Sequence, residues 1–385
     1  MDKLFFNEEH EMLRSMVQDF AKNEVEPIAQ ELDEKGKFPR DLVKQMGELG
    51  LLGIPVPEKY GGSGMDTVAY TVAMIELAKA DASLAITMQA HTSLGTMPIV
   101  LSGSEEQKLK YVPDLASGNM LGCFGLTEPG AGSDAGATQT TAELKGDEYI
   151  INGSKMFITN AGEAGLIVFT AQVIQNGEKL GIGAFIASMK TEGLEIMPKE
   201  KKMGWRASDT RQLFFNDMNI PVENMIGDTT GGFRTFLKTL VGGRVAIAAL
   251  AVGTAEGAYE RALKYSTERE AFGKPIYKFQ PISFKLADMA TKIEAAKLLV
   301  YHAAWLKDQG VEMLKEASMA KLYASDVAMD VTTEAIQVLG GYGYVKEYDV
   351  ERYFRDAKVL EIGEGTSEIQ RIVISRAIIK NALNL

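Results

Sequence analysis

The stretch Leu166-Ile167-Val168-Phe169-Thr170 is a short run of β-branched and aromatic residues near the middle of the chain. Comparable runs lie on both sides of it, and the turn signals between them are Lys145-Gly146-Asp147, Asn152-Gly153 and Asn176-Gly177. Short strands joined by tight turns predict an all-β domain with hairpins, a barrel or sandwich, over residues 121–227.

The sequence on either side of this segment shows helical periodicity. Before it, apolar residues three to four positions apart form one stripe: Leu13, Met16, Val17, Phe20 and Val25. Ser104-Glu105-Glu106-Gln107 matches the capping box that begins many helices. After the β segment a longer stripe contains Leu286, Met289, Ala290, Ile293, Ala296, Val300 and Ala304. We therefore expect an α+β multidomain chain, with an N-terminal α-helical domain over residues 1–120 and a C-terminal four-helix bundle over residues 228–385.

The composition argues against several classes of protein. The 385 residues carry a net charge of -11, whereas a nucleic-acid binder needs a basic surface for the phosphate backbone. The longest apolar run, Val245 to Val252, is far shorter than the roughly 20 residues of a membrane-spanning helix. Cys123 is the only cysteine, and the three histidines are scattered, so the sequence offers no metal site. Because the N-terminus lacks a signal or transit pattern, we expect a cytoplasmic protein.

The segment Gly363-Glu364-Gly365-Thr366 places a carboxylate where a helical pattern begins, on flexible backbone that lets it approach a ligand. Glu364 is therefore a candidate catalytic base. Taken alone, capping electrostatics in the first turn of the helix explain such a residue better. The assignment needs support from the rest of the chain.

The segment Thr127 to Ala135 formally contains the dinucleotide fingerprint as Gly130-x-Gly132-x-x-Ala135. That fingerprint requires a preceding strand and a following helix, whereas Pro129 precedes it here and strand-like sequence follows it. What remains is a glycine-rich loop whose N–H groups could bind anionic or carbonyl oxygens, or a plain turn.

Other single residues also allow more than one interpretation. Arg269 fits either a surface ion pair or a bidentate contact with a pyrophosphate. Arg244 reads as the start of an apolar helix whose N-terminus would attract an anion, or as a solvated side chain. Trp205 and Arg206 could form a surface cluster on the β domain. The glycines after Gln337 either end a helix or admit a flat or phosphorylated ligand.

Six motifs in order are far more specific than any one of them. They are Phe124-x-Leu126-Thr127-Glu128-Pro129-Gly130-Ala131-Gly132-Ser133-Asp134, Asn152-Gly153-x-Lys155-x-Phe157-Ile158-Thr159-Asn160, Arg269-x-x-Phe272-Gly273, Gln337-x-x-Gly340-Gly341-x-Gly343-Tyr344, Arg355-Asp356-Ala357 and Glu364-Gly365-Thr366-Ser367-Glu368-Ile369-Gln370-Arg371. This order resembles the acyl-CoA dehydrogenase family along essentially the whole chain, and within it the short-chain, butyryl-CoA type.

The resemblance implies FAD as a noncovalent cofactor between the β domain and the C-terminal helices, with a neighbouring subunit of a homotetramer completing the site. The residues that correspond to FAD contacts are Phe124, Leu126, Thr127, Gly132, Ser133, Phe157, Ile158, Thr159, Arg269, Phe272, Gln280, Gln337, Gly340, Gly341, Thr366 and Glu368. Those expected to touch the CoA thioester are Ser133, Val241, Arg244 and Gly365. In this scheme Arg269, Gln280 and the segment from Gln337 to Gly341 hold the pyrophosphate and adenosine side across the subunit interface.

The resemblance also implies the reaction. Glu364 takes the α-proton of an acyl-CoA, its own N–H and a flavin ribityl hydroxyl stabilise the carbonyl oxygen, and hydride leaves the β-carbon for the flavin. The expected product is a trans-2-enoyl-CoA, and the expected electron acceptor is an electron-transferring flavoprotein. The same site run in reverse would make an enoyl-CoA reductase. An oxidase, or a helical interaction protein without flavin, is a more remote alternative.

Four positions depart from patterns in relatives. Gly243 stands where some relatives carry the base, which favours Glu364. Val241 replaces an aspartate that is common at the CoA site, and Gly363 replaces a tyrosine before the base. Ala85 falls where glutaryl-CoA dehydrogenases carry an arginine for the substrate carboxylate, which argues against a dicarboxylic substrate.

Overall fold

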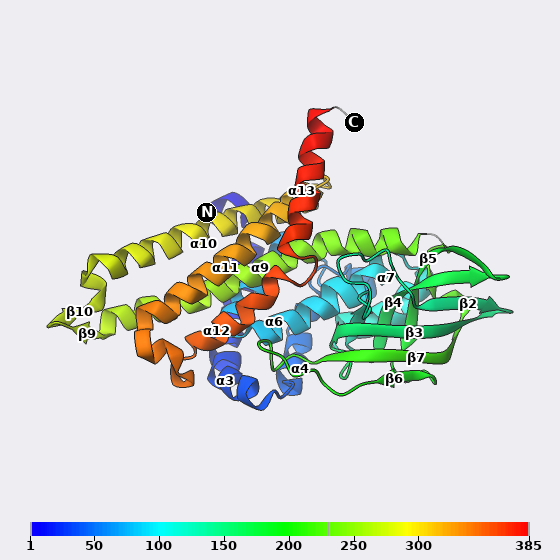
Figure 1. The fold of residues 1–385 in the computed structure, drawn as a ribbon, viewed down its shortest axis with the longest axis horizontal. Coiled ribbons are helices and arrows are strands. Elements are labelled where there is room, and N and C mark those ends of the chain that lie inside the picture. The colour runs from blue at the N-terminus through cyan, green and yellow to red at the C-terminus, as the bar shows by residue number, and fades with distance from the viewer. Residues whose placement is uncertain (1, 230, 384–385) are drawn as a thin grey trace.

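The structure is a computed structural model that describes residues 2–229 and 231–383, and its elements run from helices through a sheet to helices again (Figure 1). The helices before the sheet are α1 (Asp2–Phe5), α2 (Glu8–Phe20), α3 (Glu26–Lys35), α4 (Arg40–Glu48), α5 (Thr67–Ala80), α6 (Ala82–Gln89), α7 (Met97–Ser102) and α8 (Glu105–Ala116). The predicted capping box is confirmed at α8, because the Ser104 side chain accepts from the Gln107 N–H and the Gln107 side chain accepts from the Ser104 N–H.

Helices α6 and α7 form one nearly continuous helix. A π-helical segment, Ala90–Thr96, joins them, and it is buried throughout. Such wide turns are rare in helices and often lie at functional sites, because they change the direction of the side chains that follow. Gln89 is the last residue of α6 before this change of geometry, and it is fully buried.

The middle of the chain forms one mixed sheet. Its strands are β1 (Gly122–Gly125), β2 (Thr141–Lys145), β3 (Glu148–Thr159), β4 (Leu166–Gln175), β5 (Glu178–Ser188), β6 (Leu194–Ile196), β7 (Thr210–Pro221) and β8 (Met225–Ile226). They lie in the order β6-β7-β3-β2-β4-β5-β8, and β1 pairs in parallel with β4. The predicted β domain is therefore present between the two helical parts.

Strand β4 carries the apolar run that suggested this domain, and both of its faces are buried. Ile167 and Phe169 pack into the core of the sheet, where the Phe169 ring lies 4.9 Å from that of Phe215. Leu166 and Val168 face a second cluster that includes residues of α7, α8 and the first C-terminal helix. Burial on both faces explains why the run is continuously apolar rather than alternating.

One predicted turn was wrong. Asn152-Gly153 lies inside β3, where the pairing with β7 shifts register between Ile151 and Gly153. A Cβ on Gly153 would lie 2.6 Å from the Cα of Thr140, so glycine is needed for the close approach of two backbones. The other two turn signals are correct, since they join β2 to β3 and β4 to β5.

Long helices form the C-terminal part, together with a small hairpin. These elements are α9 (Gly232–Glu268), β9 (Glu270–Ala271), β10 (Lys274–Pro275), α10 (Gln280–Asp308), α11 (Leu314–Leu339), α12 (Val350–Ala357) and α13 (Ser367–Ala382). The predicted stripe on α10 is confirmed at Met289, Ile293, Ala296, Val300 and Ala304, which are buried against neighbouring helices.

Helix α9 runs through the centre of the molecule and corrects one expectation. Arg244 lies well inside this helix, not at its start, because the pair Gly242-Gly243 does not interrupt it. By length and composition α9 is apolar enough to cross a membrane, but 72% of its most apolar window is buried inside the protein. That burial is typical of the central helix of a globular protein.

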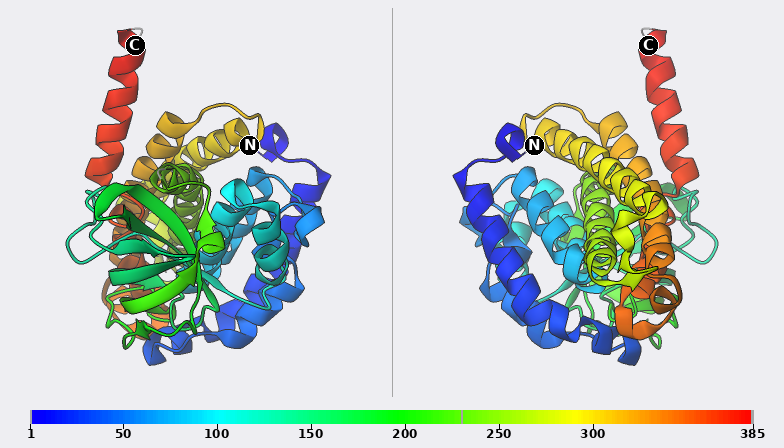
Figure 2. Two further views of the ribbon diagram at one scale, coloured as in Figure 1. Left: turned by 90° about the vertical axis from the view of Figure 1, so that its right-hand side faces the viewer. Right: turned by 90° about the vertical axis from the view of Figure 1, so that its left-hand side faces the viewer.

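Helix α13 projects away from the body of the protein, and its buried residues lie in its first turn (Figure 2). Its buried residues are Ser367 and Gln370, whereas Ile372, Ile378 and Ile379 are exposed. An isolated helix gains little stability without tertiary packing.

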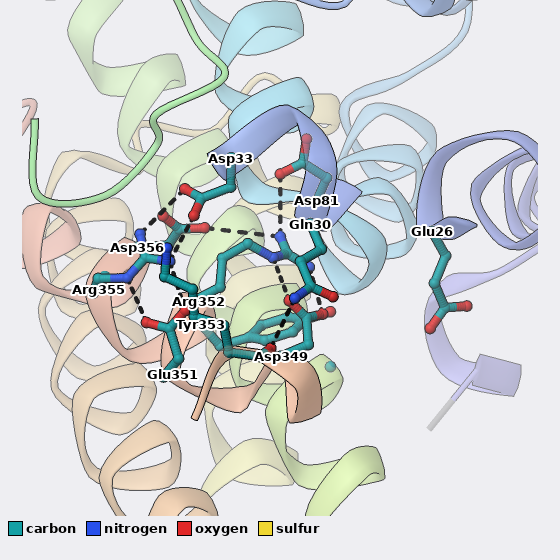
Figure 3. A network of polar contacts seen from close by, with 12 residues as sticks. Glu26, Gln30, Asp33, Asp81, Asp349, Glu351, Arg352, Tyr353, Arg355 and Asp356 are labelled. Carbon is teal, nitrogen blue, oxygen red and sulfur yellow. Dashed lines mark hydrogen bonds and ion pairs between the residues drawn. The ribbon is translucent and has the colours of Figure 1, made fainter. Parts of the chain in front are cut away.

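A polar network ties the three parts together next to α12 (Figure 3). Arg352 is buried and contacts Asp81 of the N-terminal helices, while Arg355 binds Asp33 at 2.6 Å. Asp356 accepts a 2.6 Å hydrogen bond from the N–H of Trp205, which follows the sheet's β6 strand. Trp205 and its neighbour thus lie at a junction between domains, not in a surface cluster. The chain leaves this network through Ala357 and reaches Glu364 seven residues later.

Candidate active site

Glu364 lies in a short irregular segment between α12 and α13, and its backbone is strained. Its φ angle is 52°, in the left-handed region that disfavours residues with a Cβ, and Gly365 follows with a φ of 93°. Helix α13 is capped by Thr366, whose side chain accepts from the Ile369 N–H at 3.3 Å. The capping explanation for Glu364 is therefore wrong. Strain of this kind gathers at functional sites.

The backbone around Glu364 is fixed by two buried side chains. Gln370 Nε2 donates to the carbonyl oxygens of Glu364 and Gly365, at 3.3 and 2.9 Å. Lys321 of α11 donates to the Gly365 carbonyl at 2.8 Å, and its side chain is fully buried. These bonds compensate the buried carbonyl groups and hold the strained segment in one conformation.

The carboxylate of Glu364 points into the protein toward α6 and α9. Gln89 Nε2 of α6 donates a hydrogen bond to Oε1. The other oxygen, Oε2, is buried and has no hydrogen-bond partner among the described residues. On the α9 side, a Cβ at Gly243 would overlap with Oε2, so only glycine leaves room for the carboxylate there. The glycine that argued for Glu364 as the base thus also makes its position possible.

Burial and charge oppose each other at this carboxylate. Burial raises the pKa of Glu364 to about 7, while the hydrogen bond from Gln89 and the charges of Lys321 and Arg244 act to lower it. Burial also lowers the pKa of Lys321 to about 8, and the nearby Glu364 charge partly restores it. A carboxylate with a pKa near neutral is suited to take and return a proton at physiological pH.

Arg244 lies beside the base from within α9. Its guanidinium is buried, its Nη1 lies 3.4 Å from Ser318 Oγ, and its Nε has no hydrogen-bond partner in the described parts of the chain. The structure therefore puts Arg244 next to Glu364 and Lys321 rather than at a helix N-terminus. Tyr70 of α5 lies on the same side, and the Glu364 charge adds to the burial that raises its pKa.

The predicted flavin residues of the β domain lie on β1, on β3 and on the loop that follows β1. Phe124 and Leu126 belong to β1 and the loop after it, and the Met156 N–H donates to the Thr127 carbonyl at 2.8 Å, which brings this loop against β3. Phe157 has a φ of 61° at an irregularity in β3 and is largely exposed. Ile158 points into the core of the sheet, so its contact with a ligand would be through the backbone.

A buried ion pair holds the glycine-rich loop in place. Lys155 is fully buried and donates to Glu128 Oε1 at 2.7 Å, and Glu128 also accepts from the N–H groups of Gln139 and Thr140. Beyond this anchor Gly132 and Ser133 are exposed, with open space beside Gly132. The loop therefore presents bare backbone and a hydroxyl, which suits a phosphorylated or carbonyl-bearing ligand.

Six further FAD candidates form a second group near the hairpin of β9 and β10: Arg269, Phe272, Gln280, Gln337, Gly340 and Gly341. A cleft of about 470 Å³ there is lined by Arg269, Gly340 and Gly341, with the guanidinium 5.5 Å from the Tyr342 ring. Gln280, Gln337 and the 95% exposed Phe272 surround this region without lining the cleft. A guanidinium beside glycine backbone with no Cβ in the way fits a pyrophosphate.

These two groups do not meet within one protomer. In Figure 1 the hairpin of β9 and β10 lies at one end of the molecule, and the sheet lies at the other. Thr366 and Glu368 begin α13 near the base, and Val241 lies one turn of α9 before Arg244. The structure thus brings Glu364, Arg244, Gly365 and Thr366 together, and it separates them from Arg269, Gln280 and Gln337.

Sequence reasoning missed Gln89, Lys321 and Tyr70. Gln89 and Lys321 each interrupt an otherwise apolar or small-residue helix face, and Lys321 falls between Ala317, Ala320 and Ala324. A polar residue in a buried stripe is a signal that could have been noticed. Its partner could not, because Gln89 and Glu364 are separated by 275 positions.

Comparisons with known proteins agree with this geometry. Models of the acyl-CoA dehydrogenase N-terminal, middle and C-terminal domains match residues 7–119, 123–218 and 230–379. The short-chain specific acyl-CoA dehydrogenase of Clostridium acetobutylicum is 50% identical over 97% of this chain and 98% of its own length. Butyryl-CoA dehydrogenase from Megasphaera elsdenii is 45% identical with a TM-score of 0.94, covering 97% and 99% of the two chains.

A further solved structure is similar over the same extent. It is described as "Electron transferring flavoprotein of Acidaminococcus fermentans: Towards a mechanism of flavin-based electron bifurcation". One of its chains is 49% identical to this one, with a TM-score of 0.95, and covers 97% of this chain and 99% of its own.

The contact between Gly243 and the base leads to a testable prediction. Gly243→Ala should keep the fold, since alanine is the better helix former, but it must displace the Glu364 carboxylate. Because a displacement of about 1 Å costs roughly 100-fold in rate, we expect a loss of that size in flavin reduction by butyryl-CoA.

The matched control is Gly242→Ala, where the new Cβ would meet only the flexible end of Lys307, at 3.2 Å. Stopped-flow absorbance of the bound flavin measures both variants. Equal rates for Gly243→Ala and Gly242→Ala would show that the position of the carboxylate does not matter.

Proposed function

Because this chain belongs to the acyl-CoA dehydrogenase family, whose members are FAD-dependent oxidoreductases, we propose that it dehydrogenates a short-chain acyl-CoA to the trans-2-enoyl-CoA and passes the electrons to an electron-transferring flavoprotein. The observation that carries the proposal is the buried carboxylate of Glu364 with a pKa of about 7. A thioester α-carbon is a very weak acid, so its deprotonation needs a base that is both desolvated and fixed in position.

Each residue of the site has a separate role in this proposal. FAD, when bound, supplies the acceptor for hydride. Glu364 Oε2, the oxygen without a partner among the described residues, is free to take the α-proton, while Gln89 holds Oε1. The Lys321 and Arg244 charges keep part of the Glu364 population ionised despite its burial. The exposed loop at Gly132 and Ser133 offers donors to the cofactor and the thioester.

Position 85 also supports an uncharged acyl group. Ala85 lies one helical turn before Gln89 on α6 and is fully buried, so no cation is present there to bind a second carboxylate. The similarity to short-chain specific and butyryl-CoA relatives points the same way. We propose butyryl-CoA as the reference substrate, and a panel of straight, branched and dicarboxylic acyl-CoAs tests this choice.

The catalytic prediction concerns Glu364 itself. Glu364→Gln keeps the size and shape of the side chain, so it should retain FAD and bind acyl-CoA. It removes the proton acceptor, and we expect the rate of flavin reduction to fall about 100- to 10,000-fold. Anaerobic stopped-flow absorbance with butyryl-CoA checks the rate, and equilibrium titration checks binding. Undiminished flavin bleaching in Glu364→Gln would remove Glu364 as the base.

The reverse reaction is the second candidate. In reverse, Glu364 would supply the proton to the enoyl-CoA, and the hydride would come from reduced FAD. The similar structure described with an electron-transferring flavoprotein and electron bifurcation is the reason to test this direction. Steady-state rates with oxidised and with reduced electron-transferring flavoprotein separate the two directions. We expect net oxidation of butyryl-CoA, and faster reduction of crotonyl-CoA would assign the enzyme to the reverse reaction.

We also propose that the enzyme works as a homotetramer in the cytoplasm, with each FAD site shared between subunits. The two groups of FAD candidates lie at opposite ends of one protomer, so a single cofactor could reach both only if another copy supplied one of them (Figure 1). The projecting α13 carries exposed Ile372, Ile378 and Ile379, a surface that a second copy would cover. The single cysteine leaves no intrachain disulfide, which suits a reducing compartment.

The shared site predicts the behaviour of Arg269→Ala. Loss of the guanidinium from the cleft should weaken FAD retention at least about tenfold, since a charge-assisted bond to a phosphate is lost. It should also lower the FAD-dependent stability of the tetramer. Light scattering coupled to gel filtration, with flavin absorbance on the same column, measures both. A monomeric wild-type enzyme that retains FAD would contradict the shared site.

A further inference from the structure

Two polar atoms at the base lack partners, and they belong to a bonded pair of residues. Gln89 Nε2 donates to Glu364 Oε1, yet Gln89 Oε1 and Glu364 Oε2 are both buried without any hydrogen-bond partner in residues 2–229 and 231–383. A buried acceptor without a donor is costly and calls for an explanation. Both atoms are acceptors while Glu364 is ionised, so they cannot bond to each other in that state.

The situation changes when Glu364 carries a proton. A carboxylic acid is a donor as well as an acceptor, and a carboxamide offers both functions on one planar group. A planar carboxamide can keep donating from Nε2 to Oε1 of the acid while its own oxygen accepts from a proton on Oε2, so the nitrogen and oxygen of Gln89 need not exchange places. A protonated Glu364 therefore finds an acceptor in the same side chain that donates to it when it is ionised.

We propose that Gln89 is the positioning residue of the base in both of its protonation states. It donates from Nε2 to the carboxylate before proton abstraction, and it offers Oε1 to the carboxylic acid afterwards. This inference rests on the proposed function, in which Glu364 gains the α-proton of the substrate and returns it to solvent or product. No other co-reactant is involved, and the proton is the only species that moves between the groups.

The surroundings of Gln89 support a role in holding the base. The residue ends α6 where the π-helical segment begins, so its side chain is aimed by a local change of helix geometry. Helix α6 is itself held against the sheet, because Asn160 Nδ2 donates to the Thr87 carbonyl at 3.0 Å. The hydrogen bond from Gln89 also lowers the pKa of Glu364 against the larger effect of burial.

The charged and titratable groups that face the pair come from three other elements. Lys321 of α11 and Arg244 of α9 favour the carboxylate, and Tyr70 of α5 contributes a neutral buried phenol. None of them donates a hydrogen bond to the Glu364 side chain in the described structure. Gln89 is thus the direct partner of the carboxyl group, and the cations act at longer range.

The test uses Gln89→Met, which keeps the length of the side chain and removes both hydrogen-bonding functions. Loss of the donor to the charged form should move the pKa of Glu364 upward by about one unit, the size expected when a charged acceptor loses a hydrogen bond. Flavin reduction by butyryl-CoA at pH 7 should fall about fivefold, because the ionised fraction of Glu364 falls by that factor, with KM changed less than about threefold.

A readout that does not depend on turnover measures the pKa directly. Infrared difference spectra of the holoenzyme against Glu364→Gln isolate the C=O band of the protonated acid, which is then titrated from acid to alkaline pH. The matched control is Thr87→Val on the same buried helix, which loses only the 2.9 Å bond to the Ser83 carbonyl and should leave the midpoint unchanged.

The possible results distinguish a failure of the proposed function from a failure of the proposed role of Gln89. If acyl-CoA does not reduce the wild-type flavin, the proposed function fails, while the infrared titration still judges the pair. If the wild-type enzyme is reduced but Gln89→Met keeps both the pKa and the band position of Glu364, the role of Gln89 is overturned. A shift in Thr87→Val as large as that in Gln89→Met would overturn it as well, since general disturbance of α6 would then explain the effect.

Discussion

A carboxyl group that is removed from water either finds partners or loses its charge, and the centre of this molecule is arranged around that constraint. Glu364 is held in a strained conformation, with its carboxylate directed between α6 and α9. Gln89 supplies one hydrogen bond, Gly243 supplies space, and Lys321 and Arg244 supply charge. The partners do not cancel the cost of burial, and the remaining imbalance sets the pKa near 7, as the proposed role of Glu364 as a base requires.

The same constraint explains why three domains are needed for one side chain. Glu364 follows α12, whose Arg352 and Arg355 bind the N-terminal helices, and Asp356 binds the segment after β6. These ion pairs tolerate little displacement, because a buried charge that loses its partner costs roughly 3–5 kcal/mol. They therefore fix the position of the chain just before the base. The partners of Glu364 then come from α6 in the N-terminal part and from α9 and α11 in the C-terminal part.

Much of the fold could be predicted from the sequence, because strands and helices differ in the period of their apolar residues. The stripe on α10 was clear for this reason, whereas the run at Leu166 was recognised from its β-branched and aromatic residues and from the turn signals around it. The failures share a cause, since glycine serves several purposes. Asn152-Gly153 marks a bulge instead of a turn. The glycines before Arg244 do not precede a helix start but lie within α9, where Gly243 leaves room for the Glu364 carboxylate. The residues Gln89 and Lys321 escaped because contacts between distant segments leave no local pattern.

The central claim is that partial burial of charge at Glu364 sets the base near neutral pH, and the pH dependence of proton abstraction tests it most directly. The measurement is the rate constant of flavin reduction by butyryl-CoA in the wild-type enzyme under anaerobic conditions, with saturating substrate, across the pH range in which the protein is folded. Since only the ionised base accepts a proton, the account predicts a rate that rises with pH through one ionisation with a midpoint of about 7. A rate that stays constant through neutral pH, or that falls as pH rises through 7, would contradict it.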